Sequence, residues 1–229
     1  MGKYYMPQVA AWIRGQAIRH GVPQLPEPLL NTPLEELSFR QVTEILQAGE
    51  EAGLKLYRFK SDKELLPRVR RVLGFLRSIE FDSLLDVGSG RGVFLLPLLD
   101  AFPWLEVYSA ELEGKWVDFW QELGFGGYEK VTSSRVDYCL DPFQENSWDV
   151  VTMLEVLEHM PQPEKAVAAA VKNARKYVVV SVPSKEDDNP EHIHLLTKER
   201  LTAMFRQAGC TRLHFDGVNG HLLLFAAVS

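Results

Sequence analysis

The sequence predicts an α/β fold: a doubly wound, mostly parallel seven-stranded sheet with an antiparallel C-terminal hairpin strand and an N-terminal helical cap. Three features lead to this prediction. From Ser83 onward, short apolar runs alternate with segments of helical periodicity, which is typical of a parallel sheet with crossover helices. A glycine-rich turn at 88–92 follows the first of these runs. Asn219 and Gly220 join the last two runs directly, and this dipeptide is a strong signal for a two-residue hairpin turn.

The individual elements follow from the local pattern. Strands are expected near 83–87, 106–110, 130–135, 149–154, 176–182, 211–217 and 221–228, because short apolar runs bounded by turn residues are typical of buried strands. Helices are expected between them, near 92–102, 114–123, 164–174 and 198–208. Thr197 can cap the last helix, because a threonine hydroxyl accepts a hydrogen bond from an otherwise free N–H of the first turn.

Residues 1–60 are expected to form the helical cap, and residues 61–229 the sheet domain. Thr32–Glu35 and Ser38–Gln41 both have the spacing of a capping box, so each predicts the start of a helix. Gly53 can end the helix that follows the second box. Four prolines between residues 22 and 33 predict an irregular connection there, which is a hinge candidate.

The helix that precedes the first strand is also predicted by its pattern. Ser61–Glu64 is a third capping-box signal, although Pro67 fits best in a first helical turn and favours a later start. Five apolar residues recur at helical spacing, so one stripe of this helix should be buried and its arginines should point outward. The apolar residues are Leu65, Val69, Val72, Leu73 and Leu76.

The chain is predicted to bind a nucleotide-like ligand at residues 84–92. Glycines at 88, 90 and 92 let the backbone turn sharply and approach a ligand closely. In the dinucleotide fingerprint the third glycine comes one residue later, where this chain has Val93. Asp86 would repel a pyrophosphate but attract a cationic ligand. An NAD-dependent oxidoreductase is therefore disfavoured.

Residues Asp86–Gly92 resemble the first motif of the class I S-adenosylmethionine-dependent methyltransferases, and the resemblance extends over roughly residues 65–228. It implies that S-adenosylmethionine is the cofactor. Asp86 would then face its ammonium group, Glu111 would accept from the ribose hydroxyls, and Asp137 would accept from the adenine amino group. The full cofactor-binding set implied is Asp86, Gly88, Ser89, Gly90, Gly92, Glu111, Asp137, Tyr138 and Leu154. Alternatives for the two acids are an ordinary solvated glutamate and a loop-capping aspartate.

The residues expected to act on the methyl acceptor are His159, Glu155 and His194. The first two follow the fourth expected strand and the third follows the fifth, at the carboxyl edge where open α/β sheets bind ligands. A sulfonium donor is already activated, so holding donor and acceptor together in a water-poor pocket supplies much of the catalysis. A base is needed only if the acceptor must lose a proton.

Metal-dependent methyl transfer is an alternative. If residues 155–159 formed a helical turn, Glu155, Glu158 and His159 would share one face, and His192 or His194 could complete a divalent-metal site. This arrangement resembles the methyltransferases that modify the 2′-hydroxyl at RNA 3′ ends. Pro161 leaves room for little more than one helical turn after the strand, and the acidic character of the chain disfavours RNA binding. We therefore expect no metal and a small-molecule acceptor. A non-catalytic cofactor-binding or scaffolding module is a further alternative.

Composition agrees with a cytoplasmic enzyme. The chain has 229 residues, 46% of them hydrophobic, and a formal net charge of −6, so nucleic acid is not the expected partner. Without a long apolar run or a signal-peptide pattern, no membrane partner is expected. The cationic residues concentrate between Lys55 and Arg77, and such a run is usually a solvated helix face, or else a site for an anionic substrate or partner. The sequence leaves the oligomeric state open.

Overall fold

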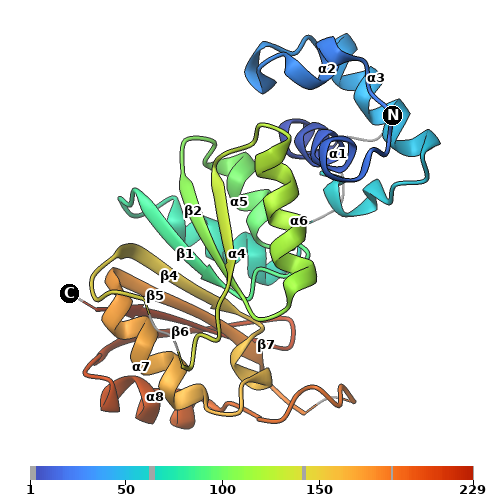
Figure 1. Ribbon diagram of the computed structural model, residues 1–229. Helices are drawn as coiled ribbons and strands as arrows, with labels where there is room; N and C mark the ends of the chain where they lie inside the picture. Colours follow the sequence, from blue (N-terminus) through green and yellow to red (C-terminus); the bar gives the residue numbers. More distant parts are fainter. Residues whose placement is uncertain (1–3, 62–64, 141–142, 187, 229) are drawn as a thin grey trace. The chain divides into compact units, whose positions relative to one another are not determined.

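The structure is a computed structural model that describes residues 4–61, 65–140, 143–186 and 188–228 (Figure 1). The chain divides into two compact units. The first comprises Met1–Leu65, Gly90–Ser109 and Glu113–Ser134, and the second comprises Leu66–Ser89, Ala110–Leu112 and Arg135–Ser229. The first unit thus combines the expected cap with part of the expected sheet domain. The domain boundary near residue 60 stays a prediction.

The sheet has seven strands in the order β3-β2-β1-β4-β5-β7-β6. Their bounds are β1 Ser83–Val87, β2 Glu106–Glu111, β3 Val131–Arg135, β4 Trp148–Leu154, β5 Ala174–Pro183, β6 Arg212–Val218 and β7 His221–Ala227. β4 pairs in parallel with β1 and β5, whereas β7 pairs antiparallel with β5 and β6. The predicted α/β class, the strand number and the antiparallel last strand are confirmed.

The turn between β6 and β7 has the predicted geometry. Asn219 has φ 41° and Gly220 has φ 86°, and a two-residue type I′ hairpin turn needs positive φ at both positions. β7 lies between β5 and β6, so its first residue, His221, is the register partner of Pro183 at the end of β5. The hairpin therefore brings His221 to the carboxyl edge of the parallel strands.

The helices of the second unit are α4 (Pro67–Leu76), α7 (Pro163–Asn173) and α8 (Lys198–Gln207), with the short η3 (Leu157–His159) after β4. In Figure 1, α7 and α8 run side by side along the strands of this unit. α4 begins at Pro67 as predicted and buries four of the five expected apolar residues, whereas Leu65 precedes the helix and is only partly buried. Residues 62–64 of the third capping-box signal lie outside the described residues. The predicted cap of α8 is confirmed, because Thr197 Oγ1 accepts from Arg200 N at 3.3 Å.

The first unit contains α1 (Met6–His20), α2 (Glu27–Asn31), η1 (Leu34–Glu36), α3 (Phe39–Glu51), η2 (Leu56–Phe59), α5 (Leu95–Ala101) and α6 (Gly114–Phe125). α1 packs closely on α6, because a Cβ on Gly15 would overlap the Glu122 carbonyl. Trp12 Nε1 also donates to the Glu122 carboxylate at 2.8 Å. The N-terminal helices thus have their own packing partner in α6, and their role as a cap over the acceptor site stays a prediction.

Two predictions for the N-terminal region were wrong and one is confirmed. The Ser38 capping box is present, with both Ser38 and Gln41 bonded as expected. The Thr32 box is absent, because the Thr32 hydroxyl donates to the Pro28 carbonyl at the end of α2. The connection at 22–33 also contains α2, because Pro28 stands in the first turn of a helix, where its missing N–H costs nothing.

The helix expected at 92–102 is shorter, since α5 begins only at Leu95 after the glycine turn. No helix in the part of the chain that the structure describes is long and apolar enough to cross a membrane.

Candidate functional site

The glycine turn after β1 has the tight backbone that its sequence predicts. Gly88, Gly90 and Gly92 all have positive φ, at 73°, 51° and 82°. In the second unit, Gly88 N donates to the Ala110 carbonyl at 2.8 Å, and a Cβ on Gly88 would overlap the Val156 side chain. In the first unit, a Cβ on Gly92 would lie 2.9 Å from both Leu96 and Trp120. All three positions favour glycine for its conformation, and Gly88 and Gly92 also require it for space.

Asp86, at the end of β1, is a buried acid with a perturbed pKa. Its side chain accepts a hydrogen bond from the Thr152 hydroxyl of the neighbouring strand β4. Burial raises the pKa of Asp86 to about 6, while hydrogen bonds from Thr152 and Ser89 oppose the rise. Burying the charged form of this carboxylate beside the glycine turn costs free energy, and a cationic ligand would offset that cost.

Glu111 and Asp137 come together through the backbone. Glu111 is a buried residue at the end of β2, and its carbonyl accepts from Val136 N at 2.8 Å. Asp137 follows directly and its Oδ1 accepts from Cys139 N at 3.1 Å, so it also caps the loop. Tyr138 is buried and donates through its hydroxyl to Asn173 Oδ1 at 2.7 Å. Each residue lies near a strand end, as a ligand site at the carboxyl edge requires.

Glu155 is the first residue after β4 and has a left-handed backbone, with φ 58°. A non-glycine residue in this region is strained, and such strain is common at functional sites. Its carboxylate accepts from Ser181 Oγ at 2.7 Å and lies 2.9 Å from His221 Nδ1 and 3.8 Å from Arg68 Nε. The left-handed backbone keeps Glu155 out of the helical turn of residues 157–159.

A second cluster consists of Glu158, His159 and His192, with ligand atoms that all lie within 4.8 Å of one another. Glu158 is fully buried. His159 Nδ1 donates to the Glu191 carbonyl at 2.9 Å, which leaves the lone pair of a neutral ring on Nε2. A backbone carbonyl often orients a metal-ligating histidine in this way. The three side chains could hold a divalent cation, whereas Glu155 belongs to the other group.

His194 lies apart from this cluster. Its Nδ1 is 3.5 Å from Arg200 NH1, and Arg200 also donates to Glu164 at 3.1 Å. Of the two histidines in the loop after β5, the structure therefore places His192 beside His159 and His194 beside α8.

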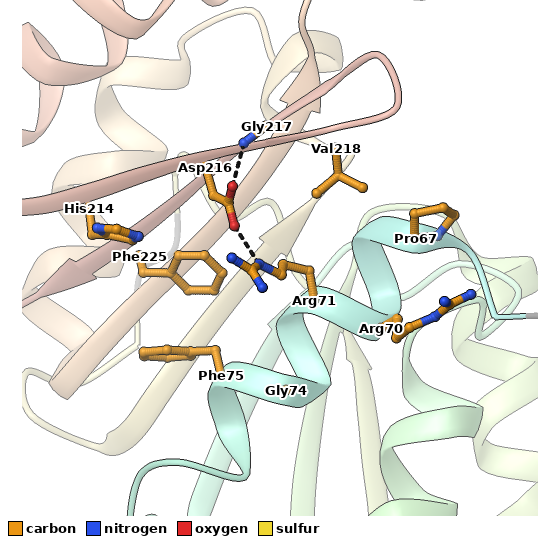
Figure 2. Close-up of a pocket in the computed structure, with 10 residues that line it drawn as sticks. All are labelled: Pro67, Arg70, Arg71, Gly74, Phe75, His214, Asp216, Gly217, Val218 and Phe225. Atoms are coloured by element: carbon orange, nitrogen blue, oxygen red, sulfur yellow. Dashed lines mark hydrogen bonds and ion pairs between the residues drawn. The ribbon is translucent and has the colours of Figure 1, made fainter.

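The second unit also contains a hollow of about 690 Å³ on the face shared by α4, β6 and β7 (Figure 2). Figure 2 shows Phe75 and Phe225 along one side of the hollow and the Arg71–Asp216 ion pair across it. Pro67 and Val218 line one end, and Val218 is the register partner of His221. The hollow therefore adjoins the Glu155 group.

Sequence reasoning missed three members of that group, namely Arg68, Ser181 and His221. Arg68 belongs to the cationic run, which was expected to be a solvated face, yet its side chain is only 20% exposed. Elsewhere in the run, Arg58 lies over the Phe119 ring at 4.7 Å. His221 follows the predicted hairpin turn, but only the strand order 5-7-6 shows that it reaches the carboxyl edge.

The strand order, the antiparallel β7 and the glycine turn after β1 define the class I methyltransferase fold. A model of the methyltransferase domain family matches residues 57–214. The chain belongs to this family, whose methyl donor is S-adenosylmethionine. No curated protein sequence matches the chain at a significant level.

Solved structures support the same fold. An S-adenosylmethionine-dependent methyltransferase from Aquifex aeolicus is 20% identical, with a TM-score of 0.59 over 72% of this chain and 91% of that one. The magnesium protoporphyrin IX methyltransferase of Synechocystis PCC 6803, solved with bound S-adenosylhomocysteine, is 15% identical, with a TM-score of 0.56 over 85% and 89%. A phosphoethanolamine N-methyltransferase from Haemonchus contortus is 14% identical, with a TM-score of 0.58 over 71% and 52%.

Proposed function

We propose that this methyltransferase transfers the methyl group of S-adenosylmethionine to an oxygen or nitrogen of a small molecule. The observation that carries the proposal is the polar group around Glu155, directly after β4. The next residue, Val156, packs on Gly88 of the glycine turn. An acceptor held by this group would thus lie beside the cofactor turn. The net charge of −6 favours a small molecule over RNA, and two of the structural neighbours are named for small-molecule substrates.

The cofactor-binding roles proposed from the sequence fit the local geometry. Asp86 would hold the ammonium group, Glu111 the ribose hydroxyls and Asp137 the adenine amino group. Gly88, Ser89, Gly90, Gly92, Tyr138 and Leu154 would form the remaining contacts. The cofactor supplies an activated methyl group, so the work of the protein is to orient the acceptor, exclude water and remove a proton where the acceptor has one to lose.

Three residues were expected to act on the acceptor, namely Glu155, His159 and His194. Glu155 and His159 are the better supported, since Glu155 lies at the end of β4 and His159 has a free ring lone pair on Nε2. The role of His194 remains a separate proposal, and its Nδ1 lies 3.5 Å from the Arg200 guanidinium.

Cofactor binding is tested by calorimetry with S-adenosylmethionine, S-adenosylhomocysteine and NAD. We expect binding of both sulfur ligands and none of NAD. The Glu111→Ala variant should lose affinity, and Glu113→Ala is the matched control because Glu113 pairs with Lys115 and is half exposed. Binding of NAD alone would refute the proposal.

The acceptor is identified by screening a metabolite pool against cofactor with a labelled methyl group. We expect a labelled small molecule, formed equally with and without chelator. Cofactor binding without any labelled product would support a scaffolding module instead.

A second candidate function is metal-assisted methylation of an RNA 3′-terminal 2′-hydroxyl, and the Glu158–His159–His192 cluster favours it. A divalent cation there would lower the pKa of a hydroxyl and orient it. The test adds RNA oligonucleotides to the same screen, with Mn²⁺, Mg²⁺ or Co²⁺ and with chelator. Chelator-sensitive RNA labelling that is lost in His159→Ala would establish this function in place of the first.

A further inference from the structure

Arg68, Glu155 and His221 form a connected polar group at the carboxyl edge of the sheet. Arg68 is in the first turn of α4, Glu155 follows β4 and His221 begins β7. Leu154 is the register partner of Ser181, and Pro183 is that of His221, so β4, β5 and β7 bring these side chains to one edge. All three side chains are 20% to 25% exposed. The group is therefore partly desolvated but open to a ligand.

The contacts define which nitrogen of His221 carries the proton. Arg68 Nη1 lies 3.4 Å from His221 Nε2. A guanidinium can only donate, so Nε2 must be the accepting nitrogen and the ring proton lies on Nδ1. Nδ1 is 2.9 Å from the Glu155 carboxylate, an ion-pair distance without the alignment of a hydrogen bond. A carboxylate beside one ring nitrogen stabilises the imidazolium that forms when the other nitrogen accepts a proton, which favours the ring as a general base.

We propose that His221 is the general base of this enzyme, that Glu155 positions it, and that the acceptor is an aryl hydroxyl whose oxygen is held by Arg68. This inference rests on the proposed methyltransferase function and adds the acceptor class. The hydroxyl replaces the direct contact between Arg68 and Nε2: it donates to Nε2 and accepts from the guanidinium, which moves aside to admit it.

The proton and electron balance of the step is complete. The aryl oxygen gives its proton to His221 Nε2 and forms a bond to the methyl carbon. The carbon–sulfur bond of the donor breaks and its electron pair stays on sulfur. The products are an aryl methyl ether, S-adenosylhomocysteine and an imidazolium, which returns its proton to water. Glu155 stabilises the imidazolium, and Arg68 stabilises the developing aryl oxyanion.

The acidity of the hydroxyl selects the aryl class. An imidazole has a pKa of about 6.5 and a phenol about 10, so proton transfer between them is uphill by about three to four orders of magnitude. For an alkyl hydroxyl, with acidity close to that of water, the gap is about nine orders of magnitude. A base without a metal therefore suits a phenol. The adjoining hollow has an aromatic side formed by Phe75 and Phe225 (Figure 2). Phe225 is four residues along β7 from His221, or about 13 Å at ~3.3 Å per residue, so this side can pack on an apolar substituent that extends from the aryl ring.

The first experiment measures binding without turnover. Para-nitrophenol, whose ionised form is yellow, is titrated into protein loaded with S-adenosylhomocysteine. We expect bound para-nitrophenol to ionise at lower pH than in buffer, because Arg68 and His221 take up its charge and proton. Arg68→Gln should weaken binding at least tenfold and His221→Gln should abolish the shift. His20→Gln, an exposed histidine at the end of α1 in the first unit, is the control that should keep both the affinity and the ionisation shift.

The second experiment measures methyl transfer to a series of phenols of increasing acidity. General base catalysis is typically worth about 100-fold to 10000-fold, so His221→Gln should lower kcat by that range with little change in KM. The loss should shrink as the phenol becomes more acidic, which a purely structural role of His221 would not produce. Glu155→Gln should show the same trend with a smaller loss, as a positioning residue does.

The outcomes separate the inference from the function on which it rests. If the protein binds S-adenosylhomocysteine but causes no ionisation shift, the inference is wrong and the methyltransferase function stands. An equal loss in His20→Gln, or a loss in His159→Gln but not in His221→Gln, also overturns it. If S-adenosylhomocysteine does not bind to the parent protein, the proposed function itself fails.

Discussion

Replacing Asp86 by Asn should stabilise the cofactor-free protein while weakening cofactor binding. The folded-state pKa of Asp86 is raised from 3.8 to about 6 because burial disfavours its charged form. The folded state therefore binds more protons than the unfolded state between these values, and stability falls as pH rises through that window. Above pH about 6 the buried carboxylate is charged, and the free energy of unfolding is lowered by the full cost of burying that charge. A shift of about 2 pKa units corresponds to about 3 kcal/mol.

Asp86→Asn removes this cost and keeps an oxygen that can accept from Thr152. We expect its free energy of unfolding at pH 7.5 to exceed that of the parent by up to about 3 kcal/mol, and the two to converge below pH about 4. Affinity for S-adenosylhomocysteine should fall by about 10-fold to 100-fold, since a charged hydrogen bond is worth about 1.5–3 kcal/mol. The assays are urea unfolding at both pH values and calorimetry.

Asp149→Asn is the matched control with the opposite sign. Burial raises the pKa of Asp149, but hydrogen bonds from Asp82 N and Arg175 outweigh it, and the net shift is downward. A lowered pKa contributes stability above the unfolded-state value, so this variant should be destabilised at pH 7.5. If Asp86→Asn were also less stable than the parent at pH 7.5, burial of the charge would not be the dominant effect at Asp86 and the reasoning would be refuted.

Three further outcomes are expected. Glu111→Ala and Asp137→Ala should each weaken S-adenosylhomocysteine binding, by roughly 0.5–3 kcal/mol per lost contact, with the fold intact in thermal melts; parent-like affinity in both would mean that these acids do not contact the cofactor. Ser38→Ala should cost about 0.5–2 kcal/mol in urea unfolding, whereas Thr32→Ala, which removes no cap, should cost much less, and equal losses would contradict the capping assignment. Chelator should leave methyl transfer to a small molecule unchanged, and a chelator-sensitive rate would instead assign the Glu158–His159–His192 cluster a metal.

The strands and the glycine turn were predictable because local sequence determines them. Short apolar runs bounded by turn residues favour buried strands, and Asn219–Gly220 fits a turn with two positive φ values. Capping signals were less reliable, because a threonine hydroxyl can bond backward to a carbonyl as easily as forward to an N–H. At Thr32 the chain is already leaving α2, so the backward bond forms.

The candidate site was predictable only in part. The glycine turn on its proposed cofactor side follows a single strand, so a local sequence motif predicts it. The group around Glu155 depends on strand order and on one left-handed residue, and neither has a local signature. Regular helical spacing would have put Glu155 beside Glu158, yet φ 58° at Glu155 directs it to Ser181 and His221 instead.

The two-residue turn before β7 fixes more than the end of the sheet. Side chains alternate between the two faces of a strand, so adding or removing one residue at Asn219–Gly220 would shift the register and turn His221 to the opposite face. Such a change would leave the glycine turn after β1 untouched. With the role proposed for His221, such a change would abolish acceptor chemistry at a position far in sequence from every residue proposed to bind the cofactor.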